Sequence, residues 1–316
     1  MKIGVVIPAY RAEATLAAVL RGLPKEIARV FVVDDASGDG SAAAAASLGD
    51  ARVEVLRHEA NRGVGGAMKT GYAAALEAGC DVIVKMDADG QMDPVHIGEL
   101  VRPLRSGEAG YTKGNRLYSL EASRAMPRER FLGNLFLSLA TKAVSGYWNV
   151  LDPTNGFTAI RADVLRRLDL RHVHERYFFE TSMLVELHLL RVPVRDVLMP
   201  ARYFGRTSSM RLVPIALEFS VRLLASLVRR LGIEYVVMDF RPGTVFAAAG
   251  LLLAAFGGTF GAYHWYESVI TGREATAGTV MVAALPLLVG VQLLLQAIVF
   301  DIGEVRDFQP LPPISD

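Results

Sequence analysis

The chain has 316 residues, of which 52% are hydrophobic and 21% are charged, and its formal net charge is +1. This length holds one sizeable α/β domain and a smaller appendage. The sequence contains no basic tract with interleaved aromatic residues, so we expect no nucleic-acid partner; the single cysteine, Cys80, excludes a disulfide framework and is typical of a reducing compartment.

The first 115 residues alternate strand and helix signals. Four short, β-branched apolar runs have the composition of buried parallel strands. The alternation predicts a doubly wound α/β sheet, in which ligands bind at the carboxyl ends of the strands. The expected strands are IGVVI (3–7), VFVV (30–33), VEVL (53–56) and VIVKM (82–86), with helices at 12–22, 39–48 and 66–78.

Candidate functional residues follow each of these strands, and DADGQ (87–91) is the sharpest signal among them. Carboxylates at i and i+2 after a strand can point into one cleft. Mg²⁺ and Mn²⁺ take oxygen ligands that substrate phosphates often complete, and such a metal would act as a Lewis acid for a departing nucleoside diphosphate. The other strand ends carry Pro8-Ala9-Tyr10, Asp34-Asp35 and Asn61-Arg62-Gly63.

Two further segments leave alternatives open. In VVDDASGDGS (32–41), Asp34 or Asp35 can accept hydrogen bonds from a base or ribose, whereas Ser37 and Asp39 can instead cap the next helix. The glycine-rich NRGVGGAMKTG (61–71) matches neither the Walker nor the dinucleotide pattern, because Met68 stands where each requires glycine. Either an anion at the helix N-terminus or a plain turn accounts for it.

The middle of the chain is mainly helical. A helix over 127–148 has one broad apolar face and lies either in the core or against a membrane. Two more helices are expected over 161–190, with Glu180 on the second, and a strand over 194–199. The segment 211–232 predicts an amphipathic helix with Arg222, Arg229 and Arg230 among apolar residues. It suits either a membrane interface, with its cations toward anionic head groups, or an ordinary packed surface.

Two uncharged stretches follow, at 244–263 and 279–300. Each is long enough to cross a bilayer as a helix, so we expect a transmembrane hairpin rather than two buried helices. We expect no N-terminal signal peptide. Arginines before the first span, against Arg273 alone in the connecting loop, place the N-terminal domain in the cytoplasm.

The expected organisation is therefore a multi-pass protein of the cytoplasmic membrane, with two spans and the catalytic domain facing the cytoplasm. The helices also offer surfaces for contact with a second copy of the chain. The expected parts are a catalytic domain (1–210), amphipathic juxtamembrane helices (211–240), a transmembrane hairpin (241–303) and a cytoplasmic tail (304–316).

Taken together, these motifs resemble family 2 glycosyltransferases with the GT-A fold. The motifs are PAYRAE (8–13), VVDDASGDGS, NRGVGGAMKTG and DADGQ, in this order and spacing. The segments KGNR (113–116), DPTNGFTAIR (152–161), FFE (178–180) and VPVRDVLMPARYFGRTSS (192–209), with the hairpin, resemble the polyprenyl-phosphate (dolichyl-phosphate) mannose or glucose synthase branch. This implies a Rossmann-like, mixed and mostly parallel sheet flanked by helices.

The resemblance also implies roles for individual residues. Arg116 and Arg202 would meet donor or acceptor phosphate, and Glu180 would line the sugar or acceptor pocket. The metal and diphosphate site would comprise Asp87, Ala88, Asp89 and Gln91, with Mg²⁺ or Mn²⁺. The nucleoside would be held by Pro8, Tyr10, Glu13, Val33 and Asp35.

The chain departs from this branch at two positions. The branch often has an arginine where Thr158 stands, and a lysine close to Met210. Both missing cations would have served phosphate contacts. The expected substitutes are Arg161, Arg206 or Arg211.

The expected reaction transfers a hexose from a GDP-mannose or UDP-glucose type donor to polyprenyl phosphate, with inversion. An acceptor phosphate monoester has its second pKa near 6 and is largely deprotonated at neutral pH, so no strong general base is required. A processive polysaccharide synthase is disfavoured, because the chain has no QxxRW motif. Another lipid or glycan acceptor, or a non-catalytic membrane scaffold, remains an alternative.

Overall fold

The computed structural model describes residues 1–116, 128–200, 212–238, 242–305 and 308–314. By its internal contacts the chain divides into two units. The first unit comprises Met1–Leu227 together with Phe308–Asp316, and the second is Val228–Asp307. The described strands all belong to the first unit, whereas the second is helical.

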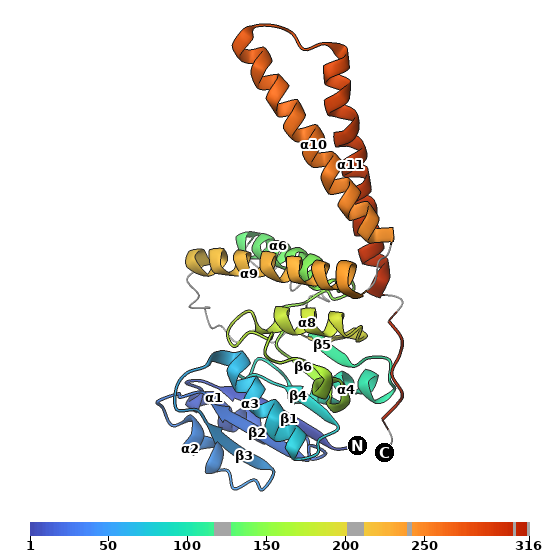
Figure 1. Ribbon diagram of the computed structural model, residues 1–316. Helices are drawn as coiled ribbons and strands as arrows, with labels where there is room; N and C mark the ends of the chain where they lie inside the picture. The colour runs from blue at the N-terminus through green and yellow to red at the C-terminus, as the bar shows by residue number, and fades with distance from the viewer. Residues whose placement is uncertain (117–127, 201–211, 239–241, 306–307, 315–316) are drawn as a thin grey trace. The chain divides into compact units, whose positions relative to one another are not determined.

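The first unit is built on a seven-stranded sheet (Figure 1). Its strands are β1 (Ile3–Ala9), β2 (Arg29–Asp34), β3 (Val53–Arg57), β4 (Val82–Lys85), β5 (Tyr111–Asn115), β6 (Thr158–Arg161) and β7 (Val194–Leu198). They lie in the order β3-β2-β1-β4-β6-β5-β7, and β6 alone runs antiparallel to its neighbours. β4 is buried along its whole length, as its apolar composition predicts. The mixed, mostly parallel sheet confirms the expected fold class.

Helices flank this sheet. They are α1 (Glu13–Arg21), α2 (Ser41–Ala46), α3 (Gly63–Glu77), the 3₁₀-helix η1 (Pro94–His96), α4 (Ile97–Arg105), α6 (Arg128–Ser145), α7 (Ala162–Arg167) and α8 (Phe179–Leu189). α3 packs on β1 and β2, and it approaches so closely at Gly71 that a Cβ atom there would collide with Val6. α4 packs on β5 and β6, and α6 packs on α8.

The apolar patterns predicted neither β5 nor β6. β5 carries a buried lysine, Lys113, and β6 has only four residues, with Thr158 and Arg161 at its ends. Neither strand therefore shows a continuous apolar run. Their polar side chains bond to segments beside the sheet: Lys113 donates to the Asn155 carbonyl, and Arg161 binds Asp163.

The antiparallel direction of β6 creates a polar row across four strands. Lys85, the last residue of β4, pairs with Thr158, the first of β6, and Thr158 also pairs with Lys113 of β5. Lys113 in turn pairs with Asp196 of β7. Directly paired residues point to the same face of a sheet. Four polar side chains thus share one face and one row.

The amphipathic helix α9 (Leu212–Gly232) contacts the first unit through its first half. The rings of Phe219 and Phe178 meet edge-on with centroids 4.9 Å apart, and the Arg222 guanidinium hydrogen-bonds to His174. Large apolar side chains on α6 and α9 are nevertheless exposed, which is typical of helices at a membrane interface. They are Leu135, Phe136 and Leu139 on α6, and Val221 and Leu224 on α9.

The C-terminal tail packs against the first unit. The Leu311 and Ile314 amides donate to the Gly107 and Arg105 carbonyls, over 2.8 and 3.0 Å. The Arg161 guanidinium donates to the Pro312 carbonyl over 2.6 Å. The chain thus leaves this unit at α9 and returns to it after the second unit. Both ends of the second unit therefore connect to the first unit, which is consistent with an even number of membrane crossings between them.

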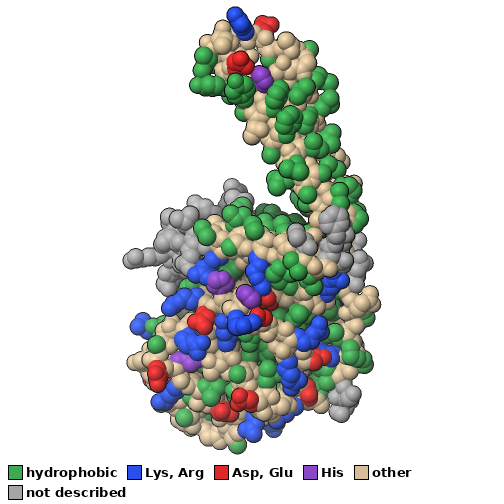
Figure 2. Space-filling model, in the orientation of Figure 1, with side chains coloured by type: hydrophobic (Ala, Val, Ile, Leu, Met, Phe, Trp, Pro, Cys, Tyr) green, Lys and Arg blue, Asp and Glu red, His purple; other side chains and the backbone are tan. Residues whose placement is uncertain are grey.

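The second unit contains two long apolar helices, α10 (Pro242–Thr271) and α11 (Ala277–Glu304), which confirm the expected hairpin. Both have the length and composition to cross a membrane, and Figure 2 shows hydrophobic side chains along them. Glycines permit close packing between the two helices: a Cβ atom on Gly290 would collide with Ala254, and one on Gly250 would lie 2.9 Å from the Gly290 carbonyl oxygen.

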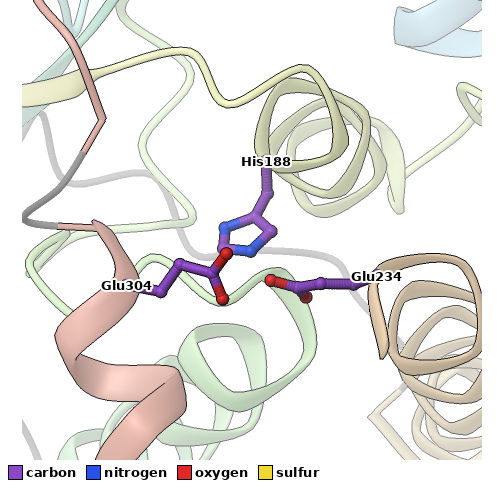
Figure 3. Close-up of side chains that lie close together, drawn as sticks. All are labelled: His188, Glu234 and Glu304. Atoms are coloured by element: carbon purple, nitrogen blue, oxygen red, sulfur yellow. The ribbon is translucent and has the colours of Figure 1, made fainter. Parts of the chain in front are cut away.

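A buried ion cluster joins the base of this hairpin to the end of α9. Arg230, which is 1% exposed, donates to both carboxylate oxygens of Asp301 over 2.7 and 3.2 Å, and to Glu234 of the π-helix η2 (Ile233–Met238) over 2.9 Å. Carboxylate oxygens of Glu234 and Glu304 come within 4.8 Å of each other (Figure 3). Of the two alternatives left open for this helix, a membrane interface with cations toward lipid head groups does not hold at Arg230, because Asp301 binds it inside the unit.

We predict that Gly107→Val releases the tail from the first unit. Gly107 has φ +82°, and a Cβ atom there would collide with the Leu311 carbonyl oxygen. Hydrogen exchange at the Leu311 and Ile314 amides should accelerate. The matched control is Gly49→Val, where φ is +62° but a Cβ atom meets nothing within 4 Å; tail amides should stay protected there. Unchanged protection in Gly107→Val would contradict this role of the glycine.

Candidate active site

The predicted nucleoside residues gather at the carboxyl ends of β1 and β2. Pro8 pairs with Val33 across the two strands, and Tyr10 follows β1 with about half of its surface exposed. The Arg11 guanidinium lies 5.2 Å from the centroid of the Tyr10 ring. The Glu13 carboxylate accepts a hydrogen bond from the Gly40 amide over 3.1 Å. These side chains form a rim with one exposed aromatic ring.

The turns at this rim are held in an uncommon backbone conformation. Arg11 and Ala36 have φ values of +53° and +55°, in the left-handed region. The Ser37 hydroxyl accepts a hydrogen bond from the Arg11 amide over 3.2 Å and donates to the Ala9 carbonyl over 3.4 Å. Ser37 therefore ties the two turns together and does not cap a helix. Asp39 does serve the start of α2, since it accepts from the Ser41 amide over 3.0 Å.

Asp35 organises the glycine-rich segment from inside the protein. Its Oδ1 atom lies 2.7 Å from Nδ1 of His58 and accepts from the Arg62 amide over 2.9 Å. Its Oδ2 atom accepts from the Gly63 amide, at the start of α3, over 2.7 Å. The Gly65 and Gly66 amides donate to the Glu175 carbonyl. The anion at this helix N-terminus is thus the protein's own carboxylate, which favours the turn over a phosphate loop.

Lys85 forms the centre of the site. This fully buried ammonium donates to Oδ1 of Asp87 over 2.7 Å and to the Gly156 carbonyl over 3.1 Å, and it lies 3.3 Å from Glu180 Oε1. Burial lowers the pKa of Lys85, but Asp87 and Glu180 outweigh this effect and raise it above its ordinary value. Glycine at position 156 leaves space for the Asp87 carboxylate, since a Cβ atom there would lie 2.8 Å from Asp87 Oδ2.

The DADGQ turn offers oxygen ligands suited to a hard divalent cation. Among the described residues, Oδ2 of Asp87 accepts no hydrogen bond, and the side chain is 34% exposed. Asp89 and Gln91 follow in the same turn, where Asp89 Oδ1 accepts from the Gln91 amide over 2.9 Å. Thr15 anchors the turn by donating to the Ala88 carbonyl over 2.6 Å. Two carboxylates and an amide match the preference of Mg²⁺ or Mn²⁺.

Arg116 lies beside the loop that precedes β6. Its guanidinium donates to both carboxylate oxygens of Asp152, over 2.9 and 3.3 Å, and its side chain is 38% exposed. Asp152 is buried, so this pair fixes the guanidinium at the sheet edge while leaving part of it accessible. That placement suits a contact with a phosphate group.

The same loop rests on a buried lysine and a buried carboxylate. Lys113 donates to the Asn155 carbonyl over 2.7 Å, and burial lowers the pKa of Lys113 to about 8. Asp196 accepts from the Leu151 amide over 2.7 Å, whereas its Oδ1 atom has no hydrogen-bond partner among the described residues. Burial raises the pKa of Asp196 to about 6.

Of the cations expected to replace the missing ones, the structure describes Arg161. Arg161 pairs with Val82 in the sheet, opposite the edge that carries Lys85 and Thr158, and it binds Asp163 over 2.8 Å. Arg161 is therefore wrong as a substitute for a phosphate-binding residue at position 158. Arg202, Arg206, Met210 and Arg211 lie outside the described residues.

Sequence reasoning missed three residues that hold the site together. Lys85 interrupts the apolar run VIVKM, and a buried ammonium requires acceptors, which the aspartates that follow can supply. Nothing in the sequence linked His58 to Asp35 or Asp152 to Arg116, because these pairs are brought together by the sheet.

Comparison with known proteins places this geometry in a family. Residues 4–169, more than half of the chain, match the model of glycosyl transferase family 2. The undecaprenyl-phosphate mannosyltransferase of Micrococcus luteus is 32% identical over 58% of this chain and 76% of its own length. The UDP-N-acetylglucosamine–dolichyl-phosphate N-acetylglucosaminyltransferase of Methanococcus voltae is 29% identical over 61% and 84%.

A solved structure shares the fold. The glucosyl-3-phosphoglycerate synthase of Mycobacterium tuberculosis superposes with a TM-score of 0.54, at 20% identity, over 73% of this chain and 80% of that chain. At this identity the likeness concerns the fold alone. It supports the mixed sheet with its flanking helices.

We predict that Asp196→Asn changes how stability depends on pH. The pKa of Asp196 is about 6 in the folded protein against an ordinary 3.8, so its favourable contribution is present below pH 4 and is lost as the pH rises through 6. At pH 7 the variant should be more stable than the wild type by about 1–3 kcal/mol, and the difference should shrink toward pH 4. Thermal unfolding in detergent measures this. A difference independent of pH would contradict the raised pKa.

Proposed function

This chain belongs to glycosyl transferase family 2, and we propose that it transfers a hexose from a nucleotide-sugar donor to polyprenyl phosphate in a membrane. The observation that carries this proposal is that one chain combines a carboxylate-lined sheet edge with an apolar two-helix hairpin. Relatives whose names specify dolichyl or undecaprenyl phosphate support the acceptor class. Their names differ in the sugar, so the proposal covers both GDP-mannose and UDP-sugar donors.

The donor would occupy the carboxyl edge of the sheet. The nucleoside would lie against Pro8, Tyr10 and Val33 on the rim, with Glu13 and Asp35 shaping the turns around it. The diphosphate would lie beside the DADGQ turn, where Asp87, Ala88, Asp89 and Gln91 would hold Mg²⁺ or Mn²⁺. When bound, the metal would neutralise negative charge on the leaving diphosphate.

Residues on the opposite side of the edge would hold and orient the acceptor phosphate. Arg116, fixed by Asp152, presents an accessible guanidinium, and Arg202 would add a second cation. Glu180 lies at the start of α8, 15% exposed, where it would line the sugar pocket. Fixed cations of this kind contribute by orientation and by electrostatic stabilisation of phosphate oxygens.

The bond changes follow from the acceptor's charge. Its phosphate monoester is largely dianionic at neutral pH, so an oxygen attacks the anomeric carbon without losing a proton to the protein. The bond from phosphate oxygen to carbon forms as the bond from carbon to diphosphate oxygen breaks. Attack opposite the leaving group inverts the anomeric configuration. The products are polyprenyl-phosphate sugar and nucleoside diphosphate.

The hairpin accounts for access to a lipid substrate. Helices α10 and α11 would keep the active unit beside the bilayer that holds the prenyl chain, with the active unit on the cytoplasmic side. The tail supports this arrangement, because it returns to the active unit after both helices. Exposed apolar side chains on α6 and α9 would contact the membrane surface.

A transfer assay in liposomes tests the proposal. We would supply a short polyprenyl phosphate, Mn²⁺ and a panel of radiolabelled GDP- and UDP-sugars, and compare the wild type with Asp89→Ala. One donor should deliver label to the organic phase, and the variant should lose about a hundredfold or more of the rate. Asp50→Ala, which removes a surface aspartate paired with Arg52, is the matched control and should keep its activity.

The contradicting result is absence of transfer from every donor while nucleotide still binds with metal. It would direct attention to another lipid or glycan acceptor. Absence of both transfer and nucleotide binding would instead favour a membrane scaffold without catalytic activity.

A further inference from the structure

The ammonium group of Lys85 connects two carboxylates that come from separate parts of the fold. Asp87 lies two residues after the end of β4, whereas Glu180 lies in the first turn of α8, more than ninety residues later in the chain. The Gly156 carbonyl, just before β6, is the third partner. An ammonium has three N–H donors. Lys85 therefore donates to Asp87 and to the Gly156 carbonyl and forms an ion pair with Glu180, all within 3.3 Å.

This arrangement differs from that of the other buried lysine in the same row. Lys113 is equally buried, but its Nζ atom donates to the Asn155 backbone carbonyl and lies 6.0 Å from the centroid of the Tyr111 ring. Lys85 instead has carboxylate partners in Asp87 and Glu180, besides the Gly156 carbonyl. These contacts suit it to position other groups.

Lys85 lies where two parts of the sheet meet. Its own strand, β4, is the last of the parallel strands whose ends would hold the nucleotide, and the neighbouring strand β6 runs antiparallel to it. The three partners of Lys85 belong to the turn after β4, to the loop before β6 and to α8. A single ammonium therefore sets the distance between the proposed diphosphate side and the proposed sugar or acceptor side.

We propose that Lys85 is a positioning residue of the transfer reaction: its ammonium group fixes the Asp87 and Glu180 carboxylates relative to each other and offsets one of their two negative charges. This inference rests on the proposed function, in which Asp87 serves the donor diphosphate and Glu180 the sugar or acceptor. Lys85 itself touches neither substrate. Its effect on the reaction passes through the two carboxylates.

The charges of Asp87, Glu180 and Lys85 predict how a substitution at Lys85 affects metal binding and sugar transfer. Asp87 and Glu180 contribute two negative charges, and Lys85 contributes one positive charge. Replacing Lys85 with a neutral residue makes this part of the site one unit more negative, which favours a divalent cation. At the same time Asp87 and Glu180 lose their common anchor. The variant should therefore transfer sugar more slowly while it binds Mn²⁺ at least as tightly as the wild type.

The experiment measures both quantities on the full-length protein in detergent. Mn²⁺ binding is followed by electron paramagnetic resonance, and transfer is measured with the donor and polyprenyl phosphate of the assay above. Lys85→Met should lower kcat by about a hundredfold, the scale that misplacement of a group by about 1 Å produces. Arg52→Met is the matched control, because it removes a cation that binds one carboxylate, Asp50, and one backbone carbonyl, that of Pro24, away from Asp87 and Glu180; it should keep both its activity and its Mn²⁺ affinity.

A second variant covers the case in which Lys85→Met does not fold. Lys85→Gln keeps amide donors for Asp87 and the Gly156 carbonyl but removes the charge. It should fold, lose activity and still bind Mn²⁺ at least as tightly as the wild type. Thermal unfolding of every variant, checked before the assays, separates loss of activity from loss of fold.

Three results would overturn the inference. Full activity in a folded Lys85→Met or Lys85→Gln protein would show that the ammonium positions nothing required for transfer. Equal losses of kcat and Mn²⁺ affinity would show that Lys85 only supports the local fold. Absence of transfer in the wild type would overturn the proposed function, and the inference with it; the first two results leave the proposed function standing.

Discussion

The burial of one ammonium group, that of Lys85, constrains the whole candidate site. A charged group inside a protein persists only when acceptors surround it, since its desolvation costs several kcal/mol. Asp87, Glu180 and the Gly156 carbonyl meet that requirement, and each comes from a different element. The antiparallel β6 makes this possible, because it brings the loop before it to the carboxyl end of β4. Position 156 is glycine because a side chain there would displace the ammonium or the Asp87 carboxylate.

A second constraint acts on the nucleotide side, where Asp35 occupies the N-terminus of α3. Helix N-termini attract anions, and here the anion is a side chain from the end of β2. The glycines of the following segment serve packing: a Cβ atom on Gly65 would collide with the His174 carbonyl. Through Arg222, the same His174 is bonded to α9. The turns that shape the nucleotide rim are thus connected by successive contacts to the amphipathic helix.

The sequence predicted those features that depend on local pattern. Apolar runs predicted β1 to β4, and the uncharged stretches predicted α10 and α11, because burial or lipid contact along a whole segment leaves a continuous signal. β5 and β6 escaped, since polar residues interrupt any apolar run and bond to distant segments: Lys113, for example, donates to the Asn155 carbonyl, 42 residues away. The role of Ser37 and the burial of Arg230 escaped for the same reason: Ser37 bonds across to Ala9, and Arg230 pairs with Asp301, 71 residues away. The motif residues were found, but not the side chains that hold them.

The most direct test of the account is a crystal structure of the protein with Mn²⁺ and either GDP or UDP, using the anomalous scattering of manganese to locate the ion. We expect one strong peak bonded to Asp87 and Asp89, with the nucleoside against Pro8 and Val33 and with Lys85 still paired to Asp87. A manganese peak at other carboxylates, or a nucleotide diphosphate at the N-terminus of α3, would contradict the proposed donor site.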